Sequence, residues 1–313
     1  MNISVIIPVY NAAEYVEKSV RSVLQFDIVK EILLIDDGSQ DNSAEICKTI
    51  AATDSRIKFM QHPDKKNHGV SATRNLGIDL ASQEFISFLD ADDYYLPNRF
   101  DAEKEYLKNP GIDGVFGALA TEFISDEGRR QYMEKFATDG LTTVRKEGEG
   151  KEIFLGLTGI TKDFGTFFSM IALTVRKSAL DRYSLRLSEK MKIGEDKEFI
   201  IKLSYHTHLK SGLINVPVAI RTGHENNTIT KIKNNSGAFF HHNYLLYSSL
   251  YQWAKKHRDI PEEARELFKY KSLSSKVASD KGLLKYFNFI RYSLFNPKLL
   301  KTRYRYYALK NNY

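Results

Sequence analysis

Three aspartates stand within four positions of this sequence, at Asp90, Asp92 and Asp93. Carboxylates this close repel one another, so a compensating positive charge is expected beside them. A divalent cation fits, because Mg²⁺ and Mn²⁺ prefer carboxylate oxygens and keep coordination positions open for phosphate. The other interpretation is an acidic turn that caps a helix near Pro97. The apolar segment 84–89, which ends directly on the cluster, favours the cation site.

The first hundred residues alternate between strand and helix patterns. Apolar runs predict strands, and amphipathic runs after Asn11 and Asn42 predict helices, with Glu14 and Glu45 completing two capping boxes. The predicted strands are 3–9, 31–35, 56–60 and 84–89, and the third helix is 71–81. This alternation predicts an α/β fold with a mostly parallel central sheet flanked by helices. Ligands bind beyond the carboxyl ends of such strands, so residues 8–11, 36–39 and 90–93 should share one rim.

The rest of the chain is less regular. We expect strands at 114–123, 167–175 and 213–220 and a helix at 195–205, with 126–151 as a loop near a second substrate. Beyond about residue 235 the composition changes to helical segments rich in Tyr, Phe and Lys. The single Cys47 excludes an internal disulfide and is expected to be a packing residue. Without a secretory signal or an apolar run of membrane length, a cytoplasmic location is predicted.

Four segments resemble the motifs of family 2 glycosyltransferases, in the same order and at similar spacing. They are residues 4–11 (SVIIPVYN), 36–43 (DDGSQDNS), 69–77 (GVSATRNLG) and 90–93 (DADD). The resemblance covers about ninety residues and implies a Rossmann-like fold of the GT-A type, with a C-terminal helical appendage. It implies a catalytic domain at 1–232, divided into a nucleotide-binding half at 1–110 and an acceptor-binding half at 111–232. A basic, aromatic helical region would follow at 233–313.

The resemblance also implies site residues in the amino-terminal half. A nucleotide-sugar site would include Pro8, Val9, Tyr10, Asn11, Asp37, Ser39, Gly69, Arg74, Asp90 and Ala91. Residues 8–11 would line the base pocket, and Asp37 would accept a hydrogen bond from the base, usually uracil. Asp90 would approach the ribose, and Asp92 would hold Mn²⁺ or Mg²⁺ against the diphosphate. Arg74 offers planar donors for phosphate; the alternative is a surface residue paired with Asp79 or Glu84.

Three residues of the carboxyl-terminal half complete the implied site. Glu195 and Asp196 resemble the family's acidic pair at the start of a helix, with Asp196 as the base that takes the acceptor's proton. The alternative is that acidic residues here only stabilise the helix amino terminus. His224, after a predicted strand, resembles a histidine that closes over the metal and diphosphate; the alternative is a solvated loop histidine.

These features predict a metal-dependent, inverting glycosyltransferase. The donor would be a nucleotide-diphosphate sugar, with UDP as the carrier, and the acceptor a glycan or a lipid-linked sugar in cell-surface polysaccharide synthesis. A nucleotidyltransferase is the rival enzyme, but it commonly carries a Gly-rich basic loop after its first strand, which residues 8–11 lack. A non-catalytic nucleotide- or carbohydrate-binding protein on the same scaffold is the other alternative.

The carboxyl-terminal segment 281–313 holds the whole excess of positive charge. It contains eight Lys or Arg and no Asp or Glu, whereas the remaining chain has 38 basic against 39 acidic residues. Nine aromatic residues are interleaved with these cations. This composition is typical of an amphipathic helix at an anionic membrane surface, and equally of a helical appendage that packs its aromatics inward. Nothing else in the chain supports nucleic-acid binding. The oligomeric state is left open.

Overall fold

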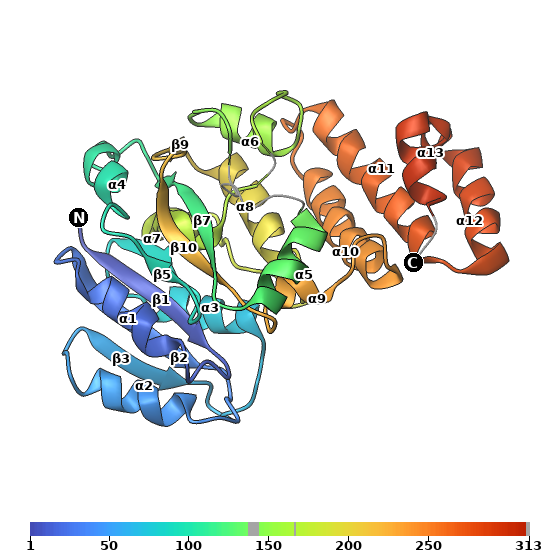
Figure 1. The fold of residues 1–313 in the computed structure, drawn as a ribbon. Helices are drawn as coiled ribbons and strands as arrows, with labels where there is room; N and C mark the ends of the chain where they lie inside the picture. Colours follow the sequence, from blue (N-terminus) through green and yellow to red (C-terminus); the bar gives the residue numbers. More distant parts are fainter. Residues whose placement is uncertain (137–143, 166, 311–313) are drawn as a thin grey trace.

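The computed structural model describes residues 1–136, 144–165 and 167–310. A seven-stranded sheet in the order β3-β2-β1-β4-β8-β6-β9 forms its centre (Figure 1). The strands are β1 (Ile3–Val9), β2 (Val29–Asp36), β3 (Ile57–Gln61), β4 (Phe85–Phe88), β6 (Gly114–Phe116), β8 (Leu173–Arg176) and β9 (Leu209–Ser211). The pairs β2/β3, β1/β2, β1/β4 and β6/β9 are parallel, and β8 runs antiparallel to both of its neighbours. The predicted mostly parallel sheet is confirmed.

Helices cover both faces of this sheet because its strands carry apolar side chains on both faces. Along β1, Val5 and Ile7 pack against the side that carries α1 and α2, while Ile6 packs against the side that carries α3 and α8. The helices of this part are α1 (Val16–Leu24), α2 (Ser43–Ala51), α3 (Val70–Leu80), α4 (Asp101–Tyr106), α6 (Lys151–Leu157), α7 (Lys177–Arg182) and α8 (Glu195–His206). Cys47 is fully buried in α2, as predicted for a packing residue.

A second, three-stranded sheet stands beside the first. Its order is β5-β10-β7, with β10 parallel to β7 and antiparallel to β5. The strands are β5 (Tyr94–Tyr95), β7 (Ala118–Phe123) and β10 (Pro217–Gly223). The predicted single strand 114–123 is therefore wrong, because the chain changes sheets at Gly117. A β-carbon there would lie 2.8 Å from Val218, so the close approach of β10 requires glycine.

Several element boundaries differ from the sequence-based predictions. The loop predicted at 126–151 begins with a helix, α5 (Asp126–Phe136), and its residues 137–143 lie outside the described residues. The strand predicted at 167–175 is a short 3₁₀ turn, η1 (Met170–Ala172), followed by β8. The last predicted strand, 213–220, starts later, at Pro217.

The two capping boxes are not formed. Helix α1 begins at Val16, not directly after Asn11, and the Asn42 side chain makes no capping hydrogen bond at the start of α2. The backbone N–H of Ser43 is bonded instead to the Asp41 carboxylate at 3.0 Å. Asn11 adopts a positive φ of 48° and uses its side chain in contact with the next loop, a competing role that removes it from the helix.

The chain ends in a group of helices. They are α9 (Thr228–Lys231), α10 (Gly237–Ala254), α11 (Glu262–Ser279), α12 (Gly282–Phe295), η2 (Pro297–Leu300) and α13 (Thr302–Ala308). Phe268 of α11 and Leu250 of α10 join the core that contains Phe199 of α8, so these helices extend the core of the sheet. The division at residue 232 stays a prediction. Among the residues described, no helix is long and apolar enough to cross a membrane.

Candidate active site

The loops after β1 and β2 are joined by hydrogen bonds. The backbone N–H of Asn11 donates to the Ser39 Oγ at 3.0 Å, and the Asn11 Oδ1 accepts from the Gln40 N–H at 2.7 Å. Parallel pairing of β1 with β2 brings the carboxyl ends of the strands together, and these bonds fix the loops beyond them. We call the three loops at the carboxyl ends of β1, β2 and β4, residues 8–11, 36–39 and 90–93, the rim.

The four residues expected to line a base pocket differ in exposure. Pro8 and Val9 are buried in β1, whereas Tyr10 is 49% exposed and Asn11 is also exposed. Only Tyr10 and Asn11 thus present their side chains at the rim. Tyr10 is a large aromatic group left uncovered beside the Ser39 loop, which is the property a base-stacking residue needs.

Asp37 supports the loop that precedes α3. Its Oδ1 accepts the backbone N–H of His68 at 2.7 Å, and its Oδ2 accepts the backbone N–H of Gly69 at 2.9 Å. The side chain is buried, with 4% exposed. A carboxylate oxygen has a second lone pair, so these bonds leave acceptor capacity for a base. The contacts with the chain itself are structural, and the role towards a base stays a prediction.

Arg74 is the buried centre of a group of charges. Its Nη2 donates to the Asp90 Oδ1, and its Nη1 lies 3.9 Å from the Glu195 Oε1. The side chain is 6% exposed, so the surface alternative is wrong; Asp79 and Glu84 pair with other arginines. Burial acts to lower the pKa of Arg74, but the carboxylates of Asp90, Glu195 and Asp196 raise it above its usual value. Arg74 therefore links the fourth motif to the start of α8.

Asp92 and His224 face each other across the two sheets. The His224 Nε2 lies 3.1 Å from the Asp92 Oδ2, and the Asn227 Nδ2 lies 3.4 Å from the same oxygen. The His224 ring is 7% exposed and stacks on Tyr15, with centroids 4.9 Å apart and planes at 16°. A solvated loop histidine would not be held in this way, so that alternative is wrong. Sequence reasoning missed Tyr15 and Asn227.

The Asp92–His224 pair has the donor chemistry of a cation site. The His224 Nδ1 accepts the Asn226 N–H at 3.2 Å, and the Nε2 lies 3.1 Å from both the Asp92 Oδ2 and the Asn227 Nδ2. A cation between the two side chains would have an imidazole nitrogen and a carboxylate oxygen as ligands. Within the described part of the chain, no three His, Cys, Asp or Glu side chains gather as a metal site. A pair of protein ligands suits a cation that takes its other ligands from water and diphosphate.

Asp93, whose role the sequence left open, points away from the rim. It is 4% exposed, and its Oδ1 accepts the backbone N–H of Thr222 in β10 at 2.8 Å. Burial, followed by the charges of Asp92 and Asp90, raises the pKa of this carboxyl well above its usual range. Helix α4 begins without a side-chain capping hydrogen bond, so Asp93 does not cap it. Its contact instead fixes the strand that leads to His224.

Glu195 and Asp196 open helix α8. Gly194 precedes them with a φ of 88°, a conformation that favours glycine and turns the chain into the helix. Glu195 is 8% exposed, and burial together with Asp196 raises its pKa to about 7, against the effect of Arg74. Asp196 is half-buried, and its Oδ1 accepts the Lys197 N–H at 2.7 Å. Both carboxylates thus stand beside Arg74 at the edge of the rim.

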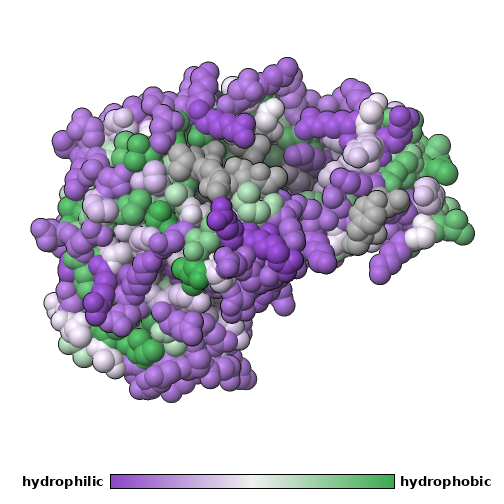
Figure 2. Space-filling view, in the orientation of Figure 1, coloured by the Kyte–Doolittle hydropathy of each residue, from purple (hydrophilic) through white to green (hydrophobic). Residues whose placement is uncertain are grey.

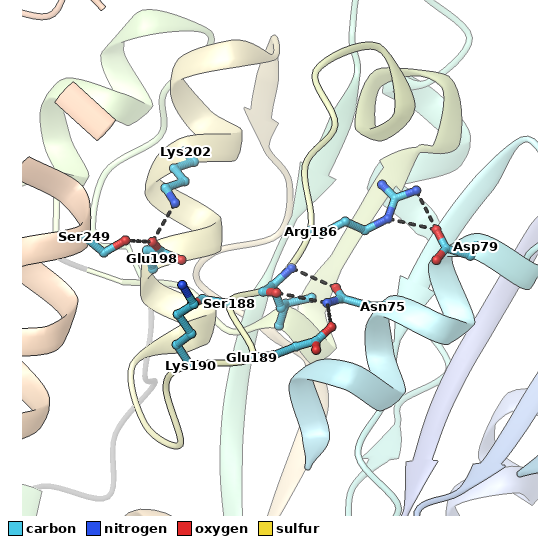
Figure 3. A pocket seen from close by; sticks show the side chains of 10 residues that line it. Asn75, Asp79, Arg186, Ser188, Glu189, Lys190, Glu198, Lys202 and Ser249 are labelled. Carbon is cyan, nitrogen blue, oxygen red and sulfur yellow. Dashed lines mark hydrogen bonds and ion pairs between the residues drawn. The ribbon is translucent and has the colours of Figure 1, made fainter. Parts of the chain in front are cut away.

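Asn75, the residue after Arg74, holds the segment that leads to α8. Its Nδ2 donates to the Leu187 carbonyl at 3.0 Å, and its Oδ1 accepts the Leu187 N–H at 2.8 Å. Figure 3 shows these bonds beside a cavity of about 550 Å³, which Glu198 of α8 and Ser249 of α10 also line. The cavity shares no residue with the predicted site. One of its walls nevertheless bears on the site, because Asn75 joins α3 to the segment that leads to α8.

Comparison with known proteins identifies the family. Residues 4–174 match the model of glycosyl transferase family 2, which is more than half of the chain, and the chain belongs to this family. The matched part contains Asp37, Arg74 and Asp92, whereas Asp196 and His224 lie beyond it.

Two relatives show how far the similarity extends. A stretch of 133 residues, 42% of this chain, is 38% identical to 21% of an uncharacterized glycosyltransferase of Rickettsia conorii. A stretch of 200 residues, 62% of the chain, is 28% identical to 54% of the succinoglycan biosynthesis protein ExoU of Rhizobium meliloti. The chain therefore matches less than two thirds of the length of either relative.

Solved structures share the fold. TarS of S. aureus, residues 1–349 in complex with UDP-GlcNAc, has a TM-score of 0.63 at 16% identity, covering 98% of this chain and 77% of that one. The mannosyltransferase PcManGT of Pyrobaculum calidifontis, in complex with GDP-Man and Mn²⁺, has a TM-score of 0.54 at 13% identity, covering 98% and 85%. At such identities the likeness establishes the architecture.

Proposed function

We propose that this chain transfers a sugar from a UDP-sugar to a hydroxyl group of a glycan or lipid-linked acceptor in cell-surface polysaccharide synthesis. The observation that carries the proposal is the pairing of Asp92 with His224 at 3.1 Å, on the same rim as the Arg74–Asp90 pair. To bind a nucleoside diphosphate, a protein needs ligands for the cation that accompanies the diphosphate and a loop that contacts the nucleoside. Family membership, the UDP-GlcNAc complex of TarS and the polysaccharide role in the name of ExoU support it.

A divalent cation, Mn²⁺ or Mg²⁺, is part of the proposal. Asp92 and His224 would hold it, and a cation bound there would act as a Lewis acid on the departing diphosphate. Oxygen and imidazole ligands together suit Mn²⁺ better than Mg²⁺. The Mn²⁺ in the PcManGT complex is in line with this choice.

The chemistry assigned to the chain's own residues is a single displacement. The Asp196 carboxylate takes the proton of the acceptor hydroxyl, and the acceptor oxygen forms a bond with the anomeric carbon. The bond from that carbon to the diphosphate oxygen breaks, and its electron pair leaves with the diphosphate. Attack opposite the leaving group inverts the anomeric configuration. Glu195, held near Arg74, orients the acceptor beside this base.

Two features favour sugar transfer over the alternatives. The segment between β1 and α1 contains no glycine and no Lys or Arg, so it lacks the phosphate-binding loop expected of a nucleotidyltransferase. A non-catalytic binding protein is disfavoured because the carboxylates that the reaction needs are present. Glu195 and Asp196 lie near the buried Arg74, and Asp92 lies beside His224.

The experiment is an initial-rate assay of nucleoside diphosphate release. The protein is incubated with Mn²⁺ and UDP-glucose, UDP-galactose, UDP-GlcNAc or GDP-mannose, with and without candidate acceptor glycans. We expect release from a UDP-sugar, about 10²–10⁴-fold slower in Asp196→Asn, the usual contribution of a positioned base. Glu225→Gln, an exposed carboxylate next to His224, is the matched control and should keep the wild-type rate. Absence of both release and nucleotide-sugar binding would refute the proposal.

The place of action belongs to the same proposal. An acceptor that is lipid-linked or part of an extending cell-surface polymer is found at a membrane. Peripheral attachment of the chain to the inner face of the cell membrane would bring the rim to such an acceptor. The basic segment from residue 281 onward is the part of the sequence that favours this location.

A further inference from the structure

Helix α12 has its polar and apolar faces reversed. The side turned to the protein contains Lys285 and Ser293 as well as Phe289, each at most 9% exposed. The Lys285 Nζ donates to the Lys310 carbonyl at 2.9 Å, and burial lowers the pKa of this lysine. A surface helix of a globular domain ordinarily buries its apolar stripe and exposes its lysines. In α12 the buried side holds a lysine and a serine.

The outward side of α12 carries the large apolar groups. Their exposed fractions lie between 52% and 87%: Leu283, Leu284, Tyr286, Phe287, Ile290, Leu294 and Phe295. Leu283, Phe287, Ile290 and Leu294 recur at the spacing of one helix face, so they form a continuous stripe. We call these seven residues the α12 outer face. Isolated exposed apolar groups are ordinary, but a contiguous face of this kind marks a contact surface.

The outer face lies at one end of the molecule. In Figure 1, α12 is the outermost helix at the carboxyl-terminal end, and the two sheets lie towards the other end. Figure 2 shows hydrophobic colour gathered at the same extremity. Leu300 of η2 and Tyr306 of α13 add exposed apolar groups close by in the sequence. A flat surface could therefore meet this end of the molecule.

The segment that carries this surface is also rich in positive charge. The exposed cations from residue 281 onward are Lys281, Arg291, Lys298, Lys301, Arg303 and Arg305, of which Arg303 lines a pocket shared with α8 and α10. Of these, Lys298 forms an ion pair with Glu266, and no pairing of the others with a described carboxylate is seen. From residue 281 onward the sequence contains no Asp or Glu. An apolar face on a segment with a large excess of cations is complementary to a surface with an apolar interior and anionic headgroups.

We propose that the α12 outer face inserts into the headgroup region of an anionic lipid bilayer, with the helix lying in the plane of the membrane. The fourteen residues of α12 give a length of about 21 Å, less than the roughly 30 Å hydrocarbon core, so the helix cannot span it. The inference deepens the peripheral location proposed above by naming the contact surface. It is independent of whether the rim transfers a sugar.

A second copy of the chain fits this surface less well. A twofold contact would place the outer face against itself, and with it the cations of both copies. No acidic residue from 281 onward could compensate for their repulsion. An anionic bilayer supplies both the apolar phase and the opposite charge.

The test is flotation of the purified full chain with vesicles on a density gradient. Vesicles of pure phosphatidylcholine are compared with vesicles of phosphatidylcholine and phosphatidylglycerol at 70:30, with phosphatidylglycerol as the chosen anionic probe (about 0.1 M salt). The test variant is Phe287→Glu/Leu294→Glu, and the control is Val216→Glu, which changes a valine 53% exposed far from α12 in the sequence. A charge-removing variant, Lys301→Gln/Arg305→Gln, tests the electrostatic part.

We expect the wild type and the Val216→Glu control to float with anionic vesicles. Binding by the Phe287→Glu/Leu294→Glu variant should weaken at least about tenfold, the least that losing two buried apolar side chains produces. The charge-removing variant should require more anionic lipid. Circular dichroism would show that the variants are folded. If the wild type does not float, or the apolar variant floats equally well, the proposal is wrong. A dimer interface would also contradict the proposal. In that case light scattering finds a wild-type dimer, the Phe287→Glu/Leu294→Glu variant alone is monomeric, and its flotation is unchanged.

Discussion

Arg74 of the third motif donates to Asp90 of the fourth, and its other terminal nitrogen lies 3.9 Å from Glu195. One buried guanidinium thus compensates carboxylates from both halves of the predicted catalytic domain. The phosphate role implied for Arg74 by its sequence motif stays a prediction. Arg74 has a structural role, because without its charge Glu195 would be a buried carboxylate beside the carboxylate of Asp196.

Replacing Arg74 by Met should therefore cost stability. We expect the free energy of unfolding to fall by about 2–3 kcal/mol, less than the loss of a fully buried partner, because Asp90 is 36% exposed. Urea unfolding at pH 7 measures the change. Adding Asp90→Asn to Arg74→Met should recover part of the loss, since it removes one of the uncompensated charges. Equal stability of Arg74→Met and wild type would contradict the central position of this arginine.

Glu195 should make stability depend on pH. In the folded chain its pKa is raised to about 7, whereas the ordinary value is 4.5. Between these values the folded state binds more protons than the unfolded state, so stability falls as pH rises through this window. The full difference corresponds to about 3 kcal/mol. We expect Glu195→Gln to flatten the dependence, measured as the difference from wild type in urea unfolding between pH 4.5 and 7.5. The exposed control Glu134→Gln should leave the slope unchanged.

Asp93 should act through a hydrogen bond and not through its charge. Asp93→Ala leaves the buried Thr222 N–H without its acceptor, which we expect to cost about 1–3 kcal/mol of stability. Asp93→Asn keeps an acceptor oxygen and should lose less, because the raised pKa already disfavours the charged carboxyl. Chemical unfolding of both variants at pH 7 distinguishes them. An asparagine variant as unstable as the alanine variant would show that the charge is needed.

His224 should set the affinity for the cation. His224→Ala removes one of the two proposed ligands. The Mn²⁺ concentration for half-maximal activity should rise about tenfold or more, because changes in residues that only contact a metal ligand already weaken metal binding by this factor. Tyr15→Ala removes the stacked ring and should cause a smaller rise by releasing the imidazole. The measurement is the rate of diphosphate release as Mn²⁺ is titrated. An unchanged midpoint in His224→Ala would remove this residue from the site.

The amino-terminal half of the fold was predictable because its determinants are local. The apolar runs of β1 and β2, the helix patterns between them and the rule for parallel strands were enough to place residues 8–11, 36–39 and 90–93 on one rim. The capping boxes were not formed, because the Asn11 side chain bonds to Gln40 and Asp41 bonds to Ser43. Short polar side chains can form hydrogen bonds with residues elsewhere in the fold as readily as with a helix terminus. The sequence alone does not show which of these hydrogen bonds forms.

Other features depend on contacts between distant segments. The change of sheet at Gly117 follows from its approach to Val218, a hundred residues away in the chain. The stacking of Tyr15 on His224 joins the first helix to the last strand, and no spacing rule relates them. The composition of 281–313 indicated an amphipathic basic helix. Only packing decides that Lys285 faces inward and Phe287 outward.

The most direct test of the account is whether cation and nucleotide bind together through Asp92. Calorimetric titration of UDP into the wild-type protein, with Mn²⁺ and with EDTA in its place, measures the coupling. We predict that Mn²⁺ strengthens UDP binding at least about tenfold, within the usual range of coupling between two ligands. In Asp92→Asn this gain should disappear, while Glu225→Gln keeps it. Binding of UDP with equal affinity in Mn²⁺ and EDTA, or a gain that survives in Asp92→Asn, would contradict the proposed site.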